Sequence, residues 1–429
     1  MQKSLELYNR AKSVIPGGVH SNSRARAPHP LYFTKAKGPY ITDVDGNEYI
    51  DLIMGNGSII FGHNYEPFVE LFNKYLPDGL VTGSETELSI DVSEKFLQFV
   101  DHDQVRFTNT GTEAITHVIQ MARAYTGKND IAVCEGAYNG WTDHVFVSAW
   151  PDLTKAGEEH NPIPLPGTGG LDPKVVESTV VIPFNKWEET ENILRREAHR
   201  LACVILEPVM IDVGFIEPDP EYLKNLRALC DELDILLVFD ELLTGFRLSL
   251  GGAQQYFGVK PDLSTFGKAI ANGYVLAAVA GKREVMEVAA PGGKTGFVGT
   301  YNGHQVSLAA AKAVFELLED GTILEELHEM TEQLINEFNN SCSRYGINGV
   351  MKGRGGHVHW YFSDTPVETY RQAARTDHET FAKFSGKLFE LNCLVSGKTL
   401  SHHKLSYSHK GEALEKLVER IDTALKSLK

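Results

Sequence analysis

The sequence has few cysteines and no long apolar run. Five cysteines are spread over 429 residues and none forms a CxxC pair, which argues against a disulfide framework and a zinc site. Nowhere do about eighteen apolar residues follow one another, and the N-terminal stretch has no apolar segment of signal-peptide length. We therefore expect a cytoplasmic protein that is neither secreted nor membrane-spanning.

Basic residues are also in deficit. The chain has 41 Lys and Arg against 57 Asp and Glu, a formal net charge of −16. This sign repels phosphate backbones and anionic lipid surfaces, so we expect neither nucleic acid nor a membrane as a partner. The composition, with 42% hydrophobic and 23% charged residues, is typical of a globular protein.

Apolar runs and helical periodicity alternate through the middle of the chain. LACVILEP (201–208) and ILLVFDE (235–241) are almost unbroken in apolar residues, as expected of strands covered on both faces. Between them, leucines recur at spacings of three and four, which predicts a helix packed on the sheet. The pattern indicates an α/β fold with a mainly parallel sheet between layers of helices.

The length exceeds what one hydrophobic core usually organises, so we expect a large and a small domain. Residues 1–60 predict a helix and a small sheet, including a hairpin at the DG turn of residues 38–52, as part of the small domain. Residues 61–310 form the expected large domain. Residues 311–429 predict the rest of the small α+β domain, with amphipathic helices around the strand-like HVHWYF.

Three features point to chemistry at one edge of the sheet. Asp240 ends a buried apolar run, and Lys268 follows another, 28 residues later. Thr110, Gly111 and Thr112 stand at a predicted helix start, where free N–H groups can hold a phosphate. Alone, each has an ordinary interpretation as a cap or a solvated residue. Together they match pyridoxal 5′-phosphate (PLP), which has a phosphate, a basic ring nitrogen and an aldehyde that condenses with an amine.

The chain resembles the class III aminotransferases of PLP fold type I nearly end to end, with a pattern like that of the glutamate-1-semialdehyde aminomutases. The resemblance is carried by PGGV (16–19), DVDGNEYIDL (43–52), NTGTEA (109–114), EGAYNGW (135–141), FDELLTGFR (239–247), PDLSTFGKAIANG (261–273) and GTYNG (299–303).

The resemblance implies a role for each residue around the cofactor. Gly111 and Thr112 would bind the phosphate, and Tyr138 would stack on the ring. Asp240 would pair with the ring nitrogen, and Lys268 would form the Schiff base and carry protons during catalysis. It also implies a homodimer with shared active sites, in which Thr300 reaches the phosphate in the neighbouring subunit.

The resemblance further places Arg24 where the family binds a substrate carboxylate, while Arg26 is expected to be a surface charge. Asn56 and, by an approximate alignment, Ser401 stand where the aminomutases have a tryptophan and a glutamate. Two cofactor neighbours also differ from the usual residues: Asn139 replaces a histidine, and Leu243 a methionine or glutamine.

We therefore expect an aminotransferase that moves an amino group between an amino donor and a carbonyl acceptor and that acts on a polar or carboxylate-bearing small molecule. The alternatives are an intramolecular aminomutase of the glutamate-1-semialdehyde type and a PLP-dependent ammonia-lyase. A nucleotide-binding loop at PGGKTG (291–296) fails on spacing, because Val288 stands where a glycine is required. A metal site at histidines 357, 359, 402 and 403 lacks a completing carboxylate, so no metal is expected.

Overall fold

The computed structural model describes residues 2–429, and its largest element is a seven-stranded sheet. Strand β12 runs antiparallel to both of its neighbours, and all other neighbouring pairs are parallel. In spatial order the strands are β4 (Gln104–Thr108), β12 (Ala277–Gly281), β11 (Leu263–Gly267), β10 (Leu236–Asp240), β9 (Leu201–Leu206), β5 (Asp130–Cys134) and β8 (Thr179–Ile182).

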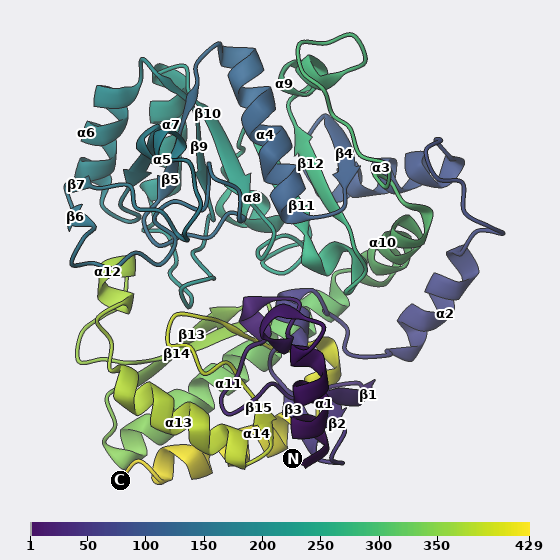
Figure 1. Cartoon of the computed structure of the whole chain (residues 1–429), viewed down its shortest axis with the longest axis vertical. Coiled ribbons are helices and arrows are strands. Elements are labelled where there is room, and N and C mark those ends of the chain that lie inside the picture. The colour runs from purple at the N-terminus through teal and green to yellow at the C-terminus, as the bar shows by residue number, and fades with distance from the viewer. Residues whose placement is uncertain (1) are drawn as a thin grey trace.

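Both faces of this sheet are covered by helices (Figure 1). On β10, Leu237 and Phe239 pack in the core that includes Leu226 of α7 (Tyr222–Glu232). The alternate residue Val238 packs on the other face with Val118 of α4 (Gly111–Thr126). Successive side chains of a strand point to opposite faces, so a strand covered on both sides is apolar throughout. The predicted α/β class is confirmed.

A second group of elements holds both ends of the chain, purple and yellow in the lower part of Figure 1. One sheet has the order β1 (Phe33–Lys37), β2 (Tyr40–Asp43), β3 (Glu48–Asp51) and β15 (Cys393–Leu394). The predicted DG hairpin is therefore present as β2 and β3, and β15 adds to it in parallel. The other sheet has the order β13 (Gly349–Arg354), β14 (His357–Phe362) and β16 (His403–Lys404). The domain limits at residues 60 and 310 stay predictions.

The remaining helices lie around these sheets, and α10 packs against α2, α3 and the turn that begins at Lys268. Their bounds are α1 (Gln2–Lys12), α2 (Glu66–Tyr75), α3 (Glu87–Phe99), α5 (Pro173–Glu177), α6 (Trp187–Glu197), α8 (Gly252–Phe257), α9 (Arg283–Met286), α10 (Gln305–Leu318), α11 (Thr322–Tyr345), α12 (Tyr370–Ala373), α13 (His378–Glu390) and α14 (Glu412–Lys426). A small ribbon pairs β6 (Gly157–Glu158) with β7 (Asn161–Pro162). None of the helices among residues 2–429 combines the length and apolar character needed to cross a membrane. All five cysteines are buried free thiols.

Arg247 ties three distant segments together after β10. Its guanidinium is fully buried and donates to the carbonyl oxygens of Gly57 (3.0 Å), Ile59 (3.3 Å) and Gly355 (3.0 Å). Burial lowers the pKa of Arg247 to about 9. Because backbone carbonyl groups, rather than a carboxylate, accept from its Nη1 and Nη2 groups, the position of Arg247 fixes the path of the backbone around it.

A buried ion pair joins helix α12 to the segment after β5. Arg371 donates from Nε and Nη2 to the two carboxylate oxygens of Glu135, each at 2.8 Å, and from Nη1 to the carbonyl of Gly157 at 3.0 Å. The neighbouring Gly136 has a φ of +89°, and a Cβ there would lie 2.2 Å from the ring of Tyr370. The chain between Glu135 and Tyr138 is thus held by α12.

Arg371→Met should destabilise the protein by about 3 kcal/mol, because it leaves the Glu135 carboxylate buried without its partner. Thermal unfolding measures the loss, and Glu135→Gln combined with Arg371→Met should recover part of it. Arg344→Met, which breaks an exposed ion pair with Asp422, is the matched control and should cost less than about 1 kcal/mol. Equal losses for the two single variants would contradict the assigned role.

Candidate active site

The predicted catalytic residues stand at neighbouring strand ends of the large sheet. Asp240 is the last residue of β10, and Lys268 directly follows β11, the parallel neighbour of β10. Tyr138 lies in the segment after β5, and α4 begins at Gly111, shortly after β4. Ligands in open α/β sheets bind outside the carboxyl ends of strands, which is where these residues lie.

The Asp240 carboxylate is buried and held by three donors. Oδ2 accepts from the amide of Asn139 at 2.9 Å, and Oδ1 accepts from the N–H of Leu242 at 3.1 Å and the hydroxyl of Thr265 at 3.4 Å. Burial raises the pKa of Asp240, while Asn139 and the charge of Lys268 act in the opposite direction. Asn139, expected only as a departure from the family pattern, therefore orients this carboxylate.

Lys268 has a backbone conformation that L-residues seldom adopt. Its φ is +50°, and it begins a 3-10 turn, Lys268–Ala271. Asn272, just after the turn, accepts at Oδ1 from the N–H groups of Ile60 (3.0 Å) and Phe61 (3.2 Å), which holds the turn in place. Strained residues of this kind cluster at functional sites. Among residues 2–429 the half-buried Lys268 amine has no hydrogen-bond partner, so it is available for reaction.

The start of α4 presents backbone N–H groups at the same edge. Thr110 is the N-cap, and its hydroxyl accepts from the N–H of Glu113 at 3.2 Å. Gly111 leaves room for the side chain of Leu242, because a Cβ at Gly111 would lie 2.4 Å from a methyl group of Leu242. The helix dipole and the free N–H groups near Thr112 favour an anion.

The three parts fit PLP. A free amine, a buried carboxylate and a helix N-terminus with free N–H groups match the aldehyde, the ring nitrogen and the phosphate of the cofactor. Tyr138 is half-buried, and its ring stacks on Trp150 with centroids 5.3 Å apart and an interplanar angle of 14°. Burial raises the pKa of the Tyr138 phenol. Its stacking on the cofactor stays a prediction.

One further carboxylate at this edge was not singled out as a site residue in the sequence. Glu207 follows β9, and its Oε2 accepts from the N–H groups of Ile211 (3.1 Å) and Asp212 (3.3 Å). Burial raises the pKa of Glu207 well above its usual range, and the charges of Asp212 and Asp240 add to this. Glu207 carries the same signal as Asp240, a carboxylate at the end of a buried apolar run.

A second lysine was also missed. Lys404 ends β16 and is 1% exposed, and its ammonium donates to the carbonyl of His402 at 3.1 Å. Burial lowers the pKa of Lys404 to about 7. The neighbouring His402 places Nε2 3.2 Å from Oδ1 of Asp212. The lysine in SHHKL (401–405) has no neighbouring sequence pattern that would predict its burial.

The predicted substrate residues lie in the turn Asn22–Arg24, in the turn Met54–Gly57 and just before β16. Arg24 and Asn56 are exposed, Ser401 is half-buried, and none of the three has a side-chain hydrogen bond within residues 2–429. Their substrate contacts stay predictions. The expectation for Arg26 was wrong: its guanidinium stacks over the ring of Phe389 at 3.7 Å and donates to a backbone carbonyl. The face of an aromatic ring attracts a planar cation electrostatically, so Arg26 is not simply a solvated charge.

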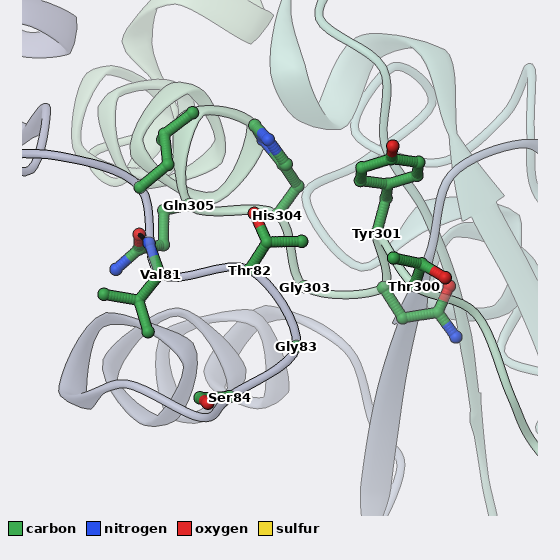
Figure 2. Close-up of a pocket in the computed structure, with 11 residues that line it drawn as sticks. Val81, Thr82, Gly83, Ser84, Thr300, Tyr301, Gly303, His304 and Gln305 are labelled. Atoms are coloured by element: carbon green, nitrogen blue, oxygen red, sulfur yellow. Dashed lines mark hydrogen bonds between the residues drawn. The ribbon is translucent and has the colours of Figure 1, made fainter.

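Thr300 is exposed and lines a separate shallow hollow, formed by residues 80–84 and 300–305. Figure 2 shows it beside Tyr301 at this hollow, which also includes Thr82 and Ser84. Lys268 is not among the lining residues. The predicted contact of Thr300 with a neighbouring subunit's cofactor stays a prediction.

The four histidines considered for a metal site are buried. His357 lies 2.8 Å from the carbonyl oxygen of Leu243 through Nε2, and His403 stacks on Trp360 with centroids 3.8 Å apart. In the part of the chain that the structure describes, no three His, Cys, Asp or Glu side chains come together to hold a metal ion.

Comparison with known proteins agrees with this geometry. The family model described as aminotransferase class-III matches residues 21–424. The glutamate-1-semialdehyde 2,1-aminomutase of Methanosphaera stadtmanae is 36% identical over 100% of this chain and 99% of its own length. A crystal structure of an omega-transaminase from Sphaerobacter thermophilus has a TM-score of 0.93 and 31% identity, and the match covers 99% of this chain and 97% of that one.

A glutamate-1-semialdehyde aminomutase from Pseudomonas aeruginosa, at 21% identity and a TM-score of 0.89 over 100% of this chain and 95% of that one, supports the fold. The fold and site are thus those of a PLP enzyme of fold type I. The chain belongs to the class III aminotransferase family, and its cofactor is PLP.

Borohydride should fix the cofactor to Lys268, because reduction makes the bond between the lysine and the aldehyde permanent. Peptide mass analysis of reduced holoenzyme should find the added mass at Lys268. Lys268→Ala should lose both the fixation and the yellow absorbance. Lys260→Ala, which removes an exposed lysine paired with Asp101, is the control and should keep both. Fixation at another lysine would contradict the assignment.

Proposed function

We propose that this enzyme moves an amino group within one carboxylate-bearing substrate, as an aminomutase of the glutamate-1-semialdehyde type. The observation that carries the proposal is the similarity to curated relatives of that name, which extends over the whole chain at 33–36% identity. These relatives favour the alternative from the sequence over the transaminase that the sequence first suggested.

The residues at the strand ends support amino transfer. Asp240 would keep a negative charge against the cofactor's ring nitrogen, and Asn139 holds it in place. When bound, PLP supplies an electron sink for the electrons released as a substrate carbon loses its proton. The Lys268 amine would take that proton and return it at another carbon.

An aminotransferase remains the second candidate, for two reasons. The omega-transaminase from Sphaerobacter thermophilus aligns over nearly the whole chain at 31% identity. Asn56 and Ser401 also replace the tryptophan and glutamate expected of the aminomutases. Such an enzyme would use a separate amino donor and a carbonyl acceptor. An ammonia-lyase has no specific observation in its favour.

An isotope experiment separates these reactions. Holoenzyme is given glutamate-1-semialdehyde with a heavy-nitrogen label, together with an unlabelled amino donor and a keto acid. An aminomutase should return the isomerised substrate with the label retained. Label in a new amino acid formed from the keto acid indicates an aminotransferase, and labelled ammonia indicates a lyase; either result would overturn the proposal. Lys268→Ala is the control, and it should give none of these products.

We also propose a homodimer with shared active sites. The hollow at Thr300 is flanked by exposed apolar side chains: Val298 is 81% exposed, Tyr301 59% and Val81 53%. Apolar groups gathered in this way mark an interaction surface. A second copy of the chain would cover them, and would bring Thr300 to its partner's phosphate.

Mixing two inactive variants tests the shared site. Lys268→Ala removes the reactive amine, and Thr300→Asp places a carboxylate against the partner's phosphate. Co-expressed subunits should form hybrid dimers with one intact site each, so activity should return, while each variant alone stays inactive. Sedimentation of both variants should still give dimers. No recovered activity in purified hybrid dimers would contradict the shared site.

A further inference from the structure

Lys404 is a buried cation without a matching anion. Its ammonium makes a single hydrogen bond, to the carbonyl of His402 at 3.1 Å. Among residues 2–429 no carboxylate lies within ion-pair distance, 4.0 Å, of this nitrogen. Taking an ammonium out of water is unfavourable unless an anion compensates it. The fold therefore keeps an unfavourable charge at this position.

The position is next to the reaction centre. Lys404 pairs with His357 across β14 and β16, and its Cε lies 3.6 Å from where a Cβ of Gly57 would be. This Cβ position of Gly57 would also lie 3.2 Å from a methyl group of Leu243, a residue three positions after Asp240. The side chains of Lys404 and Leu243 thus both pack against the turn at Gly57.

The surroundings of Lys404 contain charges of both signs. The carboxylates of Asp212 and Asp51 favour its charged form, whereas Lys268 and Arg247 oppose it. Burial keeps the pKa values of the adjacent His402 and His357 well below their usual range, so both are neutral. With a pKa of about 7, Lys404 is partly protonated near neutrality, and an arriving anion would favour proton uptake.

We propose that Lys404 binds a carboxylate of the substrate beside Lys268 and so makes the site selective for anionic substrates. This inference rests on the proposed amino-transfer function, and it adds the residue that recognises the substrate's charge. An ammonium shielded from water forms strong charge-assisted hydrogen bonds to a carboxylate. The missing anion is then supplied by the substrate itself.

The test uses holoenzyme and two probes of the same length, glutarate and its neutral diamide. Isothermal titration gives their dissociation constants for the parent enzyme and for Lys404→Met. The parent should prefer glutarate, and Lys404→Met should weaken glutarate binding by about tenfold or more while leaving the diamide unchanged. Lys410→Met removes an exposed lysine paired with Glu326 and is the matched control, with unchanged affinities.

Two further measurements separate substrate binding from a structural role. Glutarate affinity in the parent should fall from about pH 6 to about pH 9, because the protonated lysine binds the anion, and Lys404→Met should flatten this dependence. Its melting temperature should be equal to or above that of the parent, because the change removes an unpaired buried charge. Lys404→Gln, a polar neutral variant, provides the same comparison if the methionine variant fails to fold.

The outcomes are distinct. If both variants bind glutarate as the parent does, or melt lower with no selective loss of glutarate binding, the inference is wrong. Loss of PLP affinity in place of glutarate affinity would assign Lys404 to the cofactor's phosphate and would also overturn it. The isotope experiment tests the reaction independently, so a different reaction with glutarate binding still dependent on Lys404 would refute only the proposed function.

Discussion

The active site depends on a buried arginine that has no carboxylate partner among residues 2–429. Arg247 stands seven residues after Asp240 and donates to backbone carbonyls at Gly57, Ile59 and Gly355. An acceptor side chain could move away by changing its rotamer. A backbone carbonyl that accepts a hydrogen bond instead fixes the position of the main chain. The turn at Gly57 carries Asn56 and packs against Lys404. Arg247 therefore holds this turn in a fixed position relative to the strand that ends at Asp240. Asn272, which accepts from the N–H groups of Ile60 and Phe61, adds a second tie between the same segments.

The packing of these segments also brings several ionisable side chains together in a buried part of the site. Glu207, Asp212 and Asp240 lie near the cations Lys268 and Lys404, and burial shifts each carboxylate pKa upward. The cost of burying one group is partly offset by the others, so the site behaves as a coupled set. Asn139 contributes by donating to Asp240 at 2.9 Å, which favours its charged form. A carboxylate that must stay ionised against a ring nitrogen benefits from this donor.

Much of this could be predicted from the sequence because it depends on local patterns. The alternation of apolar runs and helical stripes predicted the parallel sheet, and strand-end positions predicted Asp240 and Lys268. The helix start at Gly111 and its end at Gly127, which has a φ of +73°, follow from glycine and capping signals. The end of β9 carries the same signal at Glu207, so that residue could have been found by the same rule.

Other parts of the site could not be predicted because they depend on contacts between distant segments. Arg26 and Phe389 are more than three hundred residues apart, and no periodicity links them. Lys404 has an unremarkable sequence context, and it becomes a buried charge only when β16 pairs with β14 and the turn at Gly57 closes over it. Most lysines are solvated, so composition argues against such a position. The residues proposed to select the substrate therefore lie on segments that long-range packing brings to a cofactor edge already defined by local sequence.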